Sequence, residues 1–334
     1  MIGLGMAVTP HARALQDLAG EVEVAAAFSP SPARRAAFGE RFGFPLADRL
    51  EAVLGDPSVD AVMILTPPNT HLDLVGRAAA AGRHVLLEKP LEVETGRAEA
   101  LVAACAAAGV TLAVVLQHRF RPAAERLASL LAAGALGDLV GCSTTIRLWR
   151  PQAYYDEPGR GTRARDGGGV LMTQGIHTLD LMLSLAGPVA AVTGFTATTR
   201  VHRMEAEDMA CAAVRFANGA LGVIDATTAA FPGFPERIEL TGTRATASLA
   251  GGDLHVAWHD GRTEAVAADS SAGGTGADPM AFSHEGHRAV LADFVDALRS
   301  GRAPRVSGAA ALEVHRLIDA LVETGETGAP VSPG

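Results

Sequence analysis

The sequence predicts an α/β protein in which a doubly wound parallel sheet is followed by a domain built on an antiparallel sheet. Up to about residue 120, near-continuous apolar strand patterns alternate with helical patterns, which is typical of a parallel sheet covered on both faces. Beyond that point, strand patterns follow one another and are separated by hairpin signals such as Asn218-Gly219. Two amphipathic helical patterns, at 285–299 and 308–324, close the chain.

The first predicted domain spans residues 1–120. Helices are expected at 10–20, 31–43, 46–56, 70–81 and 94–108, and strands at 22–28, 61–67, 84–90 and 110–117. Gly82 and Gly109 stand where two of these helices should end. Because a glycine-rich turn at Gly3 should follow a strand, we expect a first strand of roughly five residues before it, most of which this sequence lacks.

The second predicted domain spans residues 121–334. It begins with a helix at 122–133, and its strands are expected at 139–149, 190–200, 209–217, 220–229, 236–241, 244–249 and 254–259. Gly251-Gly252 and Asp260-Gly261 are further hairpin signals, and hairpins join antiparallel strands. The glycine- and serine-rich stretch at 269–278 is interpreted as a mobile loop.

The composition favours a two-domain protein that acts on a small molecule. The chain has 334 residues, of which 48% are hydrophobic, enough for a large core. It contains no apolar run of about 18 residues, the length of a membrane span. Its net charge of −9 argues against binding to nucleic acids or membrane surfaces. The three cysteines, far apart in the sequence, indicate neither a disulfide framework nor a metal site. We therefore expect a cytoplasmic protein without a bound metal.

Lys89 is the only lysine among the 28 lysine and arginine residues. Asparagine is nearly absent as well, while alanine and glycine abound, a bias typical of a GC-rich coding sequence that exchanges lysine for arginine. Arginine is a planar, permanently charged fork, whereas lysine is a compact donor whose pKa can shift. A retained lysine is expected where a guanidinium group cannot substitute for it. The alternative is chance survival of a surface residue.

Gly3 and Gly5 begin a Gly-x-Gly-x-x-Val pattern in which Val8 replaces the third glycine of a dinucleotide-binding fingerprint. The first two glycines permit a tight turn and the close approach of a pyrophosphate. Gly3, Gly5, Met6 and Ala7 are therefore candidate cofactor contacts. Val8 is expected to push the following helix slightly away or to require a small neighbour such as Ala7.

The end of the second predicted strand bears on the choice between NADP and NAD. An acidic residue in this region usually binds the ribose hydroxyls of NAD. Here the strand ends at Phe28 without a carboxylate, and Ser29, Ser31 and Arg34 offer donors for a 2′-phosphate instead. The pattern favours NADP over NAD. The alternative is that the arginines of the following helix are only solvated.

Three segments together resemble the Gfo/Idh/MocA family, named after glucose-fructose oxidoreductase, inositol dehydrogenase and a rhizopine catabolism protein. They are ILTPPNTHLDLVGRAAAAGRHVLLEKPL at 64–91, LQHRFRPA at 116–123 and DGGGVLMTQGIHTLDLMLSLAGPV at 166–189, and the Glu-Lys-Pro tripeptide around Lys89 is the most specific part. The resemblance implies an NAD(P)-binding Rossmann domain followed by an α/β domain with a large, mostly antiparallel open sheet. In this family the second domain binds the substrate and builds oligomers, so a homodimer or homotetramer is expected.

The resemblance also implies that Lys89 and His177 are catalytic and contact the substrate. Lys89 would bond the reacting oxygen and stabilise its negative charge, while His177 would act as a general base or acid. Thr173 stands where the family commonly has Asp or Asn. Its hydroxyl can hold a substrate but cannot take up a proton at neutral pH. Asp180 would either orient the imidazole of His177 or form a local salt bridge.

Further candidate contacts follow from the resemblance and from positions at strand ends, where ligands bind in doubly wound folds. The cofactor candidates are Thr66, Pro67, Asn69, His71, Glu88 and Gln117. Of these, His71 can also be a helix N-terminal residue, and Glu88 can meet the neighbouring lysine instead of a ribose. Arg119 is assigned to the nicotinamide or the substrate. Tyr154 and Tyr155 lie in a loop that reaches the substrate in this family, or they fill the core.

The expected activity is hydride transfer between NADP or NAD and a secondary alcohol or ketone of a sugar, sugar acid or cyclitol. Five arginines between Arg147 and Arg165 precede the segment that presents His177, and they predict an anionic substrate. A solvated basic loop or contacts across an oligomer interface are the alternatives. Two other functions stay open: a non-catalytic dinucleotide-binding sensor or scaffold, suggested by Val8 and Thr173, and a dihydrodiol-type dehydrogenase.

Overall fold

The chain folds into two compact units, seen in a computed structural model that describes residues 1–267 and 283–334. Unit 1 comprises Met1–Gln117 and His284–Leu312, and unit 2 comprises His118–Ser283 and Glu313–Gly334. The loop predicted at 269–278 lies outside the described residues.

The first boundary between the units lies close to the predicted boundary at residue 120. The second differs from the prediction, which placed the whole C-terminal part in the second domain. Residues 284–312 return to unit 1 because helix α10 (Glu285–Ser300) packs against α1 (Val8–Asp17). A contact between residues so far apart in the sequence leaves no local signal.

Unit 1 contains a parallel sheet of short strands. β1 (Ala27–Phe28) pairs with β2 (Leu46–Ala47), and β4 (His84–Leu87) lies between β3 (Ala61–Ile64) and β5 (Leu112–Val114). Ile2 forms parallel bridges with Phe28 and Ile64, so it joins the two groups of strands. The predicted doubly wound parallel sheet is confirmed. Each strand is shorter than its apolar pattern, because the residues beyond it leave the sheet as loops.

The helices of unit 1 follow the predicted pattern. Besides α1 and α10 they are α2 (Pro32–Phe42), α3 (Leu50–Leu54), α4 (His71–Ala80) and α5 (Thr95–Ala107), with the short η1 (Pro68–Thr70) before α4. Gly82 and Gly109 follow α4 and α5 with φ angles of 72° and 66°, which confirms their predicted places at helix ends. The helix predicted at 46–56 is limited to α3 because Leu46 and Ala47 pair with β1.

The centre of this parallel sheet is formed by Met1 and Ile2. The Ile2 N–H donates to the Met63 carbonyl at 2.8 Å, and the Phe28 N–H donates to the Met1 carbonyl at 2.9 Å. Beside them, residues 22–26 form no strand and, with β3, α1 and α10, border a cavity of about 570 Å³.

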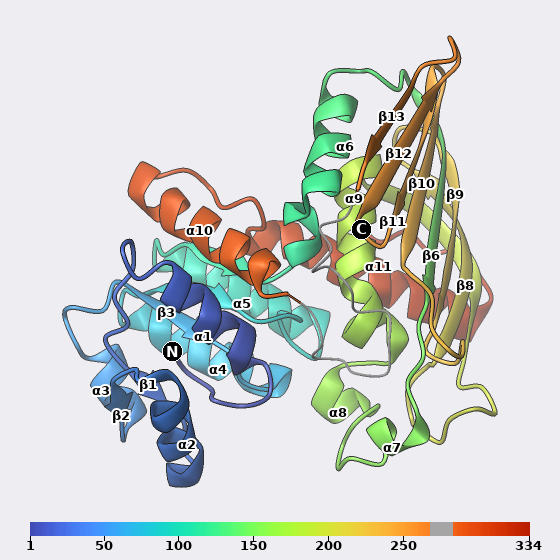
Figure 1. Cartoon of the computed structure of the whole chain (residues 1–334). Helices are drawn as coiled ribbons and strands as arrows, with labels where there is room; N and C mark the ends of the chain where they lie inside the picture. The colour runs from blue at the N-terminus through green and yellow to red at the C-terminus, as the bar shows by residue number, and fades with distance from the viewer. Residues whose placement is uncertain (268–282) are drawn as a thin grey trace. The chain divides into compact units, whose positions relative to one another are not determined.

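Unit 2 is built on an eight-stranded sheet (Figure 1). Its strands are β6 (Leu139–Arg147), β7 (Val189–Ala197), β8 (Met209–Phe216), β9 (Leu221–Thr227), β10 (Arg237–Gly242), β11 (Ala245–Ala250), β12 (Asp253–Trp258) and β13 (Thr263–Val266). Their order is β13-β12-β11-β10-β6-β9-β8-β7. Among these described strands, neighbours are antiparallel except β6 and β9, which are parallel. The large, mostly antiparallel sheet is confirmed, and β13 is a strand that the sequence analysis missed.

Helices α6 (Pro122–Ala132) and α9 (Ile176–Ala186) cover one face of this sheet (Figure 1). α9 contacts β6 and β10, while α6 contacts β11 and β12. Apolar side chains are exposed on the sheet as well: Phe195 on β7 is 77% exposed and Leu221 on β9 is 61% exposed. Along β9, Leu221 and Val223 are exposed, whereas Ile224 and Ala226 are buried. This alternation is expected of a strand in a sheet that is covered on one face.

The connection between β6 and β7 is largely helical and contains the segment that ends at His177. It includes the short helices α7 (Gln152–Tyr155) and α8 (Arg163–Asp166), and a π-helical turn, η3 (Leu171–Gly175), leads directly into α9. A π-helical turn is rare and frequently lies at a functional site. This connection is therefore the first place in unit 2 to examine for a site.

Helix α11 (Gly308–Thr327) is the last helix of the chain, and its residues belong to unit 1 up to Leu312 and to unit 2 from Glu313. It confirms the helix predicted at 308–324. Within the described residues, neither α11 nor any other helix combines the length and the apolar character needed to cross a membrane.

Candidate active site

The glycine loop precedes α1 in unit 1. Gly3 has a φ of +98°, and a Cβ atom there would lie 2.8 Å from the carbonyl carbon of Leu65, so only glycine fits without strain. Gly5 faces open space, and Val8 begins α1 as a buried residue. No side chain caps the amino end of α1. Its first N–H groups therefore suit an anion such as a pyrophosphate.

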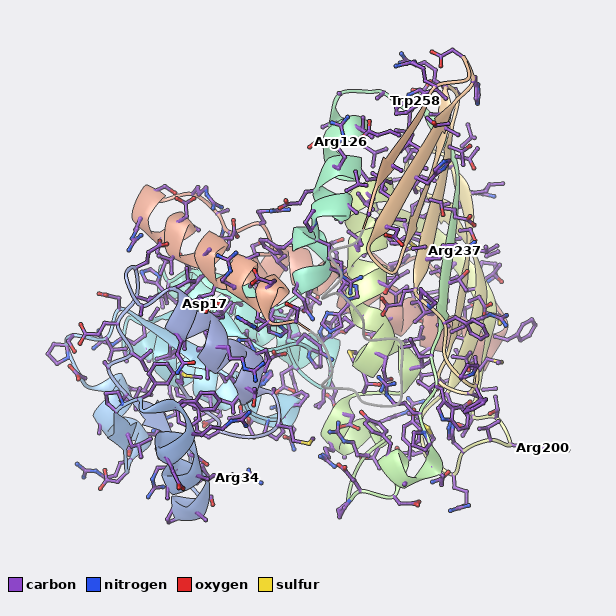
Figure 2. All side chains as sticks on the ribbon, in the orientation of Figure 1. Asp17, Arg34, Arg126, Arg200, Arg237 and Trp258 are labelled. Atoms are coloured by element: carbon purple, nitrogen blue, oxygen red, sulfur yellow. The ribbon has the colours of Figure 1, made fainter. Side chains whose placement is uncertain are left out.

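The turn after β1 holds the residues expected at a 2′-phosphate. Ser29 is buried, and its Oγ accepts the Ser31 N–H at 3.3 Å. Ser31 is the N-cap of α2, where its Oγ accepts the Arg34 N–H at 3.4 Å. Arg35 donates to the Ser29 carbonyl at 2.6 Å, whereas the Arg34 side chain extends into solvent (Figure 2). Ser29 is thus a buried turn residue whose contact with the cofactor stays a prediction, and Arg34 is the exposed cation.

His71 links two loops that follow strands of the parallel sheet. It is fully buried at the amino end of α4. Its Nε2 lies 2.8 Å from the Thr66 carbonyl oxygen, after β3, and its Nδ1 lies 3.0 Å from the Pro90 carbonyl oxygen, after β4. Burial lowers the pKa of His71, and the carbonyl groups oppose that shift. The His71 side chain is enclosed, as expected of a residue at a helix amino end, whereas Pro67 and Asn69 are exposed, and a contact of His71 with the cofactor stays a prediction.

Lys89 follows β4 and is held through the carboxylate of Glu88. Glu88 Oε2 accepts the Lys89 N–H at 3.0 Å, and Glu88 Oε1 lies 2.7 Å from His11 Nε2. Burial by itself raises the pKa of Glu88, but the hydrogen bond and charge of His11, with further positive charge nearby, lower that pKa to about 2. Of the two partners expected for Glu88, a cofactor ribose and Lys89, the structure contains the contact with Lys89, through its main-chain N–H. A second partner, His11, was not expected from the sequence.

Gln117 follows β5 at the start of the short helix η2 (Gln117–Phe120). Its Oε1 is buried and has no hydrogen-bond partner within the described residues. A buried amide oxygen without a donor is costly in free energy, so such an atom calls for an explanation. The carboxamide of a nicotinamide ring offers a matching N–H donor. Gln117 therefore stays a predicted nicotinamide contact.

In unit 2, the glycine run before His177 is shaped by Glu207. A Cβ atom on Gly169 would lie 1.7 Å from the Glu207 carbonyl oxygen. The two segments of the chain can therefore approach this closely only because residue 169 is a glycine. The buried Glu207 carboxylate accepts the N–H groups of Gly169 and Leu171, each at 3.1 Å. Burial raises the pKa of Glu207, and these backbone donors oppose the shift. The sequence analysis missed Glu207, which lies in a connection without a recognisable motif.

His177 lies in the first turn of α9, and its ring centroid is 5.0 Å from that of His118. Asp180, one turn further on, is fully buried and accepts from Arg119 Nε at 2.7 Å and from Arg119 Nη2 at 2.5 Å. Burial raises the pKa of Asp180, and the guanidinium opposes that shift. Asp180 thus forms a salt bridge, but with a residue 61 positions away and not the local one that was expected. The Arg119 guanidinium anchors α9 in this way, and its contact with the nicotinamide or the substrate stays a prediction.

The remaining predicted substrate residues differ in their surroundings. Thr173 Oγ1 donates to the Gly169 carbonyl at 2.6 Å, within the π-helical turn. Tyr155 is buried, with its hydroxyl 2.7 Å from Thr228 Oγ1, and burial raises the pKa of Tyr155 to about 12. Tyr155 therefore lies in the core, as the alternative interpretation expects, and its contact with the substrate stays a prediction. Tyr154 is half-buried and its hydroxyl accepts from Gln174 Nε2 at 3.4 Å, so its assignment stays a prediction.

The five arginines of the 147–165 segment fall into two groups. Arg147 pairs with Asp225 at 2.5 Å, Arg163 pairs with Glu326 at 2.9 Å, and Arg165 donates to the Pro158 carbonyl. These three are engaged by other parts of unit 2. The guanidinium carbons of Arg160 and Arg150 lie 4.9 and 5.8 Å from the centre of the Tyr154 ring. Arg160 also pairs with Glu157 at 3.4 Å, and Arg150 donates to the Trp149 carbonyl at 2.8 Å.

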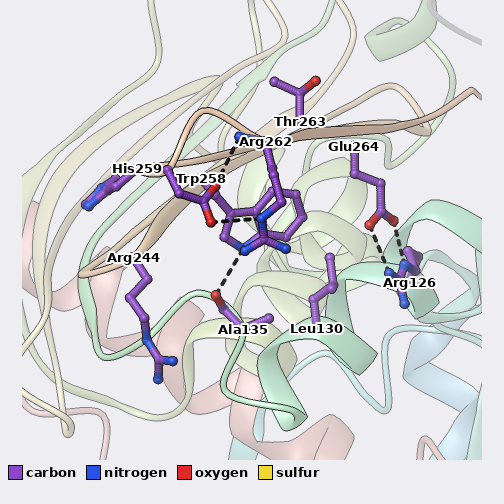
Figure 3. A pocket seen from close by; sticks show the side chains of 10 residues that line it. Arg126, Leu130, Ala135, Arg244, Trp258, His259, Arg262, Thr263 and Glu264 are labelled. Carbon is purple, nitrogen blue, oxygen red and sulfur yellow. Dashed lines mark hydrogen bonds and ion pairs between the residues drawn. The ribbon is translucent and has the colours of Figure 1, made fainter.

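Unit 2 also contains a cavity of about 700 Å³ between α6 and the β12–β13 hairpin (Figure 3). Trp258 lies in its wall and donates through Nε1 to the Ala135 carbonyl at 3.2 Å. Arg126 pairs with Glu264 at 2.6 Å, and Arg262 pairs with Asp260 at 2.8 Å. Two of the arginines that line this cavity are therefore neutralised by neighbouring carboxylates. The cavity holds none of the residues predicted from the sequence.

Comparison with known proteins bears on both units. Residues 1–116 match the family described as "Oxidoreductase family, NAD-binding Rossmann fold", and residues 124–248 match the "GFO/IDH/MocA C-terminal domain". The two matches lie in unit 1 and unit 2, in the order that the sequence predicted.

Characterised relatives and solved structures extend this likeness over nearly the whole chain. D-apiose dehydrogenase of Paraburkholderia graminis is 30% identical, covering 99% of this chain and 88% of that protein. D-xylose 1-dehydrogenase (NADP(+)) 2 of Haloferax volcanii is 29% identical, covering 94% and 93%. The crystal structure of the WlbA dehydrogenase from Bordetella pertussis, in complex with NADH and UDP-GlcNAcA, is 28% identical with a TM-score of 0.84, covering 99% of this chain and 97% of that one.

Proposed function

The chain belongs to the Gfo/Idh/MocA family of NAD(P)-dependent oxidoreductases, and from this premise we propose that Lys89 and His177 carry out its hydride-transfer chemistry. The substrate is a secondary alcohol or ketone of a sugar, sugar acid or cyclitol. The observation that carries the proposal is Lys89: it is the only lysine of the chain and its main chain is held by the preceding glutamate.

In the oxidation direction, the substrate loses a hydride from carbon and a proton from oxygen. The nicotinamide ring supplies the hydride acceptor when the cofactor is bound. His177 takes the hydroxyl proton, because imidazole is the side chain suited to proton exchange near neutral pH. The Lys89 ammonium donates a hydrogen bond to the same oxygen and stabilises its developing negative charge. In the reduction direction each step is reversed.

For the cofactor, we propose a binding site at the glycine loop and the following strand ends. Its residues are Gly3, Gly5, Met6, Ala7, Ser31, Arg34, Thr66, Pro67, Asn69 and Gln117. The uncapped amino end of α1 supports a pyrophosphate there, and the exposed Arg34 beside a turn without a carboxylate supports NADP over NAD. The Haloferax volcanii relative is named for NADP, whereas the Bordetella pertussis structure contains NADH.

For the substrate, we propose an anionic sugar recognised beside Tyr154. The guanidinium groups of Arg150 and Arg160 lie 5.8 and 4.9 Å from the centre of this half-buried ring. Nε of Arg150 is buried without a hydrogen-bond partner within the described residues, whereas Arg160 is also paired with Glu157 and Asp166. A carboxylate or phosphate would supply the missing acceptor. The Bordetella pertussis relative, 28% identical, was crystallised with a nucleotide sugar acid, UDP-GlcNAcA.

The function is tested by following NAD(P)H formation with a panel of sugars, uronic acids and inositols. Lys89→Arg is expected to lower kcat/KM by about 10²–10³, because the charge remains but the compact donor is lost. Its Kd for the cofactor should stay within a few fold, and the exposed Arg49→Lys serves as a matched control. Near-normal turnover by Lys89→Arg would remove Lys89 from the chemistry. Cofactor binding without turnover of any compound in the panel would favour the sensor or scaffold.

The anionic substrate has its own test, in which kcat/KM for a uronic acid and its neutral sugar are compared at low and high salt. Arg150→Met and Arg160→Met should reduce the preference for the acid, and high salt should weaken it in the wild type. Arg200→Met, a change of an arginine that extends into solvent (Figure 2), should leave the preference unchanged. Equal and salt-insensitive rates for the two sugars would contradict an anionic substrate.

We propose further that the protein is a cytoplasmic homo-oligomer. The exposed apolar residues Phe195 and Leu221 on the eight-stranded sheet support a protein contact, since large exposed apolar side chains gather at interfaces. Phe195→Asp should lower the mass measured by light scattering if this surface joins two copies. A monomeric wild type would contradict the proposal.

A further inference from the structure

Three titratable side chains of unit 1 form a buried cluster next to Lys89. His11 comes from α1, Glu88 from the loop after β4, and His287 from α10. His11 and His287 are 1% and 5% exposed. Their ring centroids lie 4.8 Å apart with the ring planes perpendicular, an edge-to-face contact. The cluster therefore connects the helix after the glycine loop with the loop that carries Lys89.

The ionisation of Glu88 determines which atom of His11 carries the proton. A carboxyl group whose pKa is lowered to about 2 is ionised at neutral pH, and a carboxylate only accepts hydrogen bonds. His11 Nε2, 2.7 Å from Glu88 Oε1, must therefore hold a proton and donate it. The other carboxylate oxygen accepts the Lys89 N–H at 3.0 Å. Glu88 thus bridges the His11 ring and the main chain of Lys89.

The same three side chains could also hold a metal ion, since their ligand atoms lie within 4.8 Å of one another. The distance of 2.7 Å between His11 Nε2 and Glu88 Oε1 favours the hydrogen bond instead. Two ligands of one tetrahedral zinc ion, each about 2.1 Å from it, stand roughly 3.4 Å apart.

His287 supports the His11 ring without adding a charge. Burial lowers the pKa of His287 to about 3, with a further lowering by the charge of His11, so this imidazole is neutral in the working range of an enzyme. A neutral ring packed edge-on against His11 limits the orientations that the His11 ring can adopt. The direction of the Nε2 donor toward Glu88 is thereby restricted.

We propose that His11 is a positioning residue for Lys89, acting through Glu88. The inference rests on the proposed role of Lys89 in hydride transfer. His71 already binds the Pro90 and Leu91 carbonyl groups at 3.0 and 3.1 Å, on the far side of Lys89. With His11 and Glu88 on the near side, the main chain of Lys89 is held at both ends. Loss of His11 removes the donor from one Glu88 oxygen and releases the near side.

The test begins with kinetics of the full-length enzyme. His11→Leu should lower kcat by about 10- to 100-fold, the usual cost of losing an outer partner of a site residue. The Kd for NAD(P) should stay within about threefold, which also shows that unit 1 is folded. His11→Gln should recover most of kcat, because its amide nitrogen can donate to Glu88 from nearly the same place. His255→Gln, a change of an exposed histidine on β12, is the matched control.

A pH profile separates positioning from a merely structural role. In His11→Leu the hydrogen bond and charge that lower the Glu88 pKa are gone, so burial raises it toward the working range. Glu88 then takes up a proton as the pH falls, and the acid limb of log kcat should move to higher pH. The other groups that face Glu88 are His71, His287 and Lys89. These three groups remain in the variant. When His11→Leu is combined with Glu88→Gln, residue 88 can no longer take up a proton, so the shift of the acid limb should disappear.

Two kinetic results would overturn the inference. One is a His11→Leu enzyme with kcat within twofold of the wild type and an unshifted acid limb. The other is a parallel loss of kcat and cofactor affinity that His11→Gln does not rescue. Loss of activity on dialysis against a chelator, restored by zinc, would also overturn it in favour of a metal. If Lys89→Arg is nearly fully active, the proposed function itself fails; if only the His11 variants behave normally, the positioning role alone fails.

Discussion

The two proposed catalytic residues are supported in different ways. Lys89 follows a strand of a parallel sheet, and its supports, His11 and His71, lie on two separate helices of unit 1. His177 lies in a helical connection, supported by the Glu207 carboxylate under the glycine run and by the Arg119–Asp180 pair one turn further along. Strand ends of a parallel sheet meet at one edge and bring distant residues together. The position of His177, in a helical connection, depends instead on the turn that precedes it and on the buried Arg119–Asp180 pair.

Replacing His177 is expected to have the largest effect. His177→Ala should lower kcat by about 10²–10⁴ and flatten the pH profile between about pH 6 and 8, because the residue that exchanges the proton is lost. The check is a pH–rate profile of the variant, with the exposed His255→Ala as control. An unchanged profile would reduce His177 to a structural residue and leave Lys89 as the only proposed catalytic group.

The second-largest effect is expected on the free energy of unfolding, when the buried Arg119–Asp180 pair of unit 2 is broken. Arg119→Met leaves the fully buried Asp180 carboxylate without its partner and should lower the free energy of unfolding by about 3–5 kcal/mol. Urea denaturation measures this change, and the double variant Arg119→Met with Asp180→Leu should regain most of it.

The matched control for that experiment is Arg126→Met. Arg126 and Glu264 form a comparable ion pair in the same unit, but their side chains are 45% and 28% exposed. An ion pair in contact with water contributes little to the free energy of unfolding. Equal losses for Arg119→Met and Arg126→Met would contradict the view that burial of the Asp180 pair supports α9.

Cofactor preference is expected to show the smallest of these effects. Arg34→Ala should raise the Kd for NADP by about tenfold, the worth of one hydrogen bond to a charged group, and leave the Kd for NAD within twofold. Fluorescence titration with NADPH and NADH measures both, and Arg49→Ala on an exposed side chain is the control. A wild type that already binds NADH more tightly than NADPH would show that Arg34 does not recognise a 2′-phosphate.

The residues of the candidate site that belong to a sequence motif could be predicted. The residues that support them through hydrogen bonds from elsewhere in the chain could not. Lys89 was found from its isolation among arginines and from its tripeptide, and Gly3 from the loop pattern, which its φ of +98° requires. His11 and Glu207 escaped, since each resembles an ordinary helix or loop residue until a distant chain packs on it. His71 and Tyr155 are enclosed by other parts of the chain, which a motif does not reveal, and their contacts with cofactor and substrate stay predictions.

From the sequence alone follow most helices and strands of unit 1, the parallel and the mostly antiparallel sheet, and the family of the protein, but not β13 or the short helices between β6 and β7. These follow from local periodicity, turn residues and short motifs, which depend on neighbours along the chain. Only the tertiary structure decided that residues 284–312 return to unit 1, that Asp180 pairs with Arg119, and that Glu88 lies between His11 and Lys89. Such contacts join residues far apart in sequence, and their hydrogen bonds form only after the strands and helices have packed.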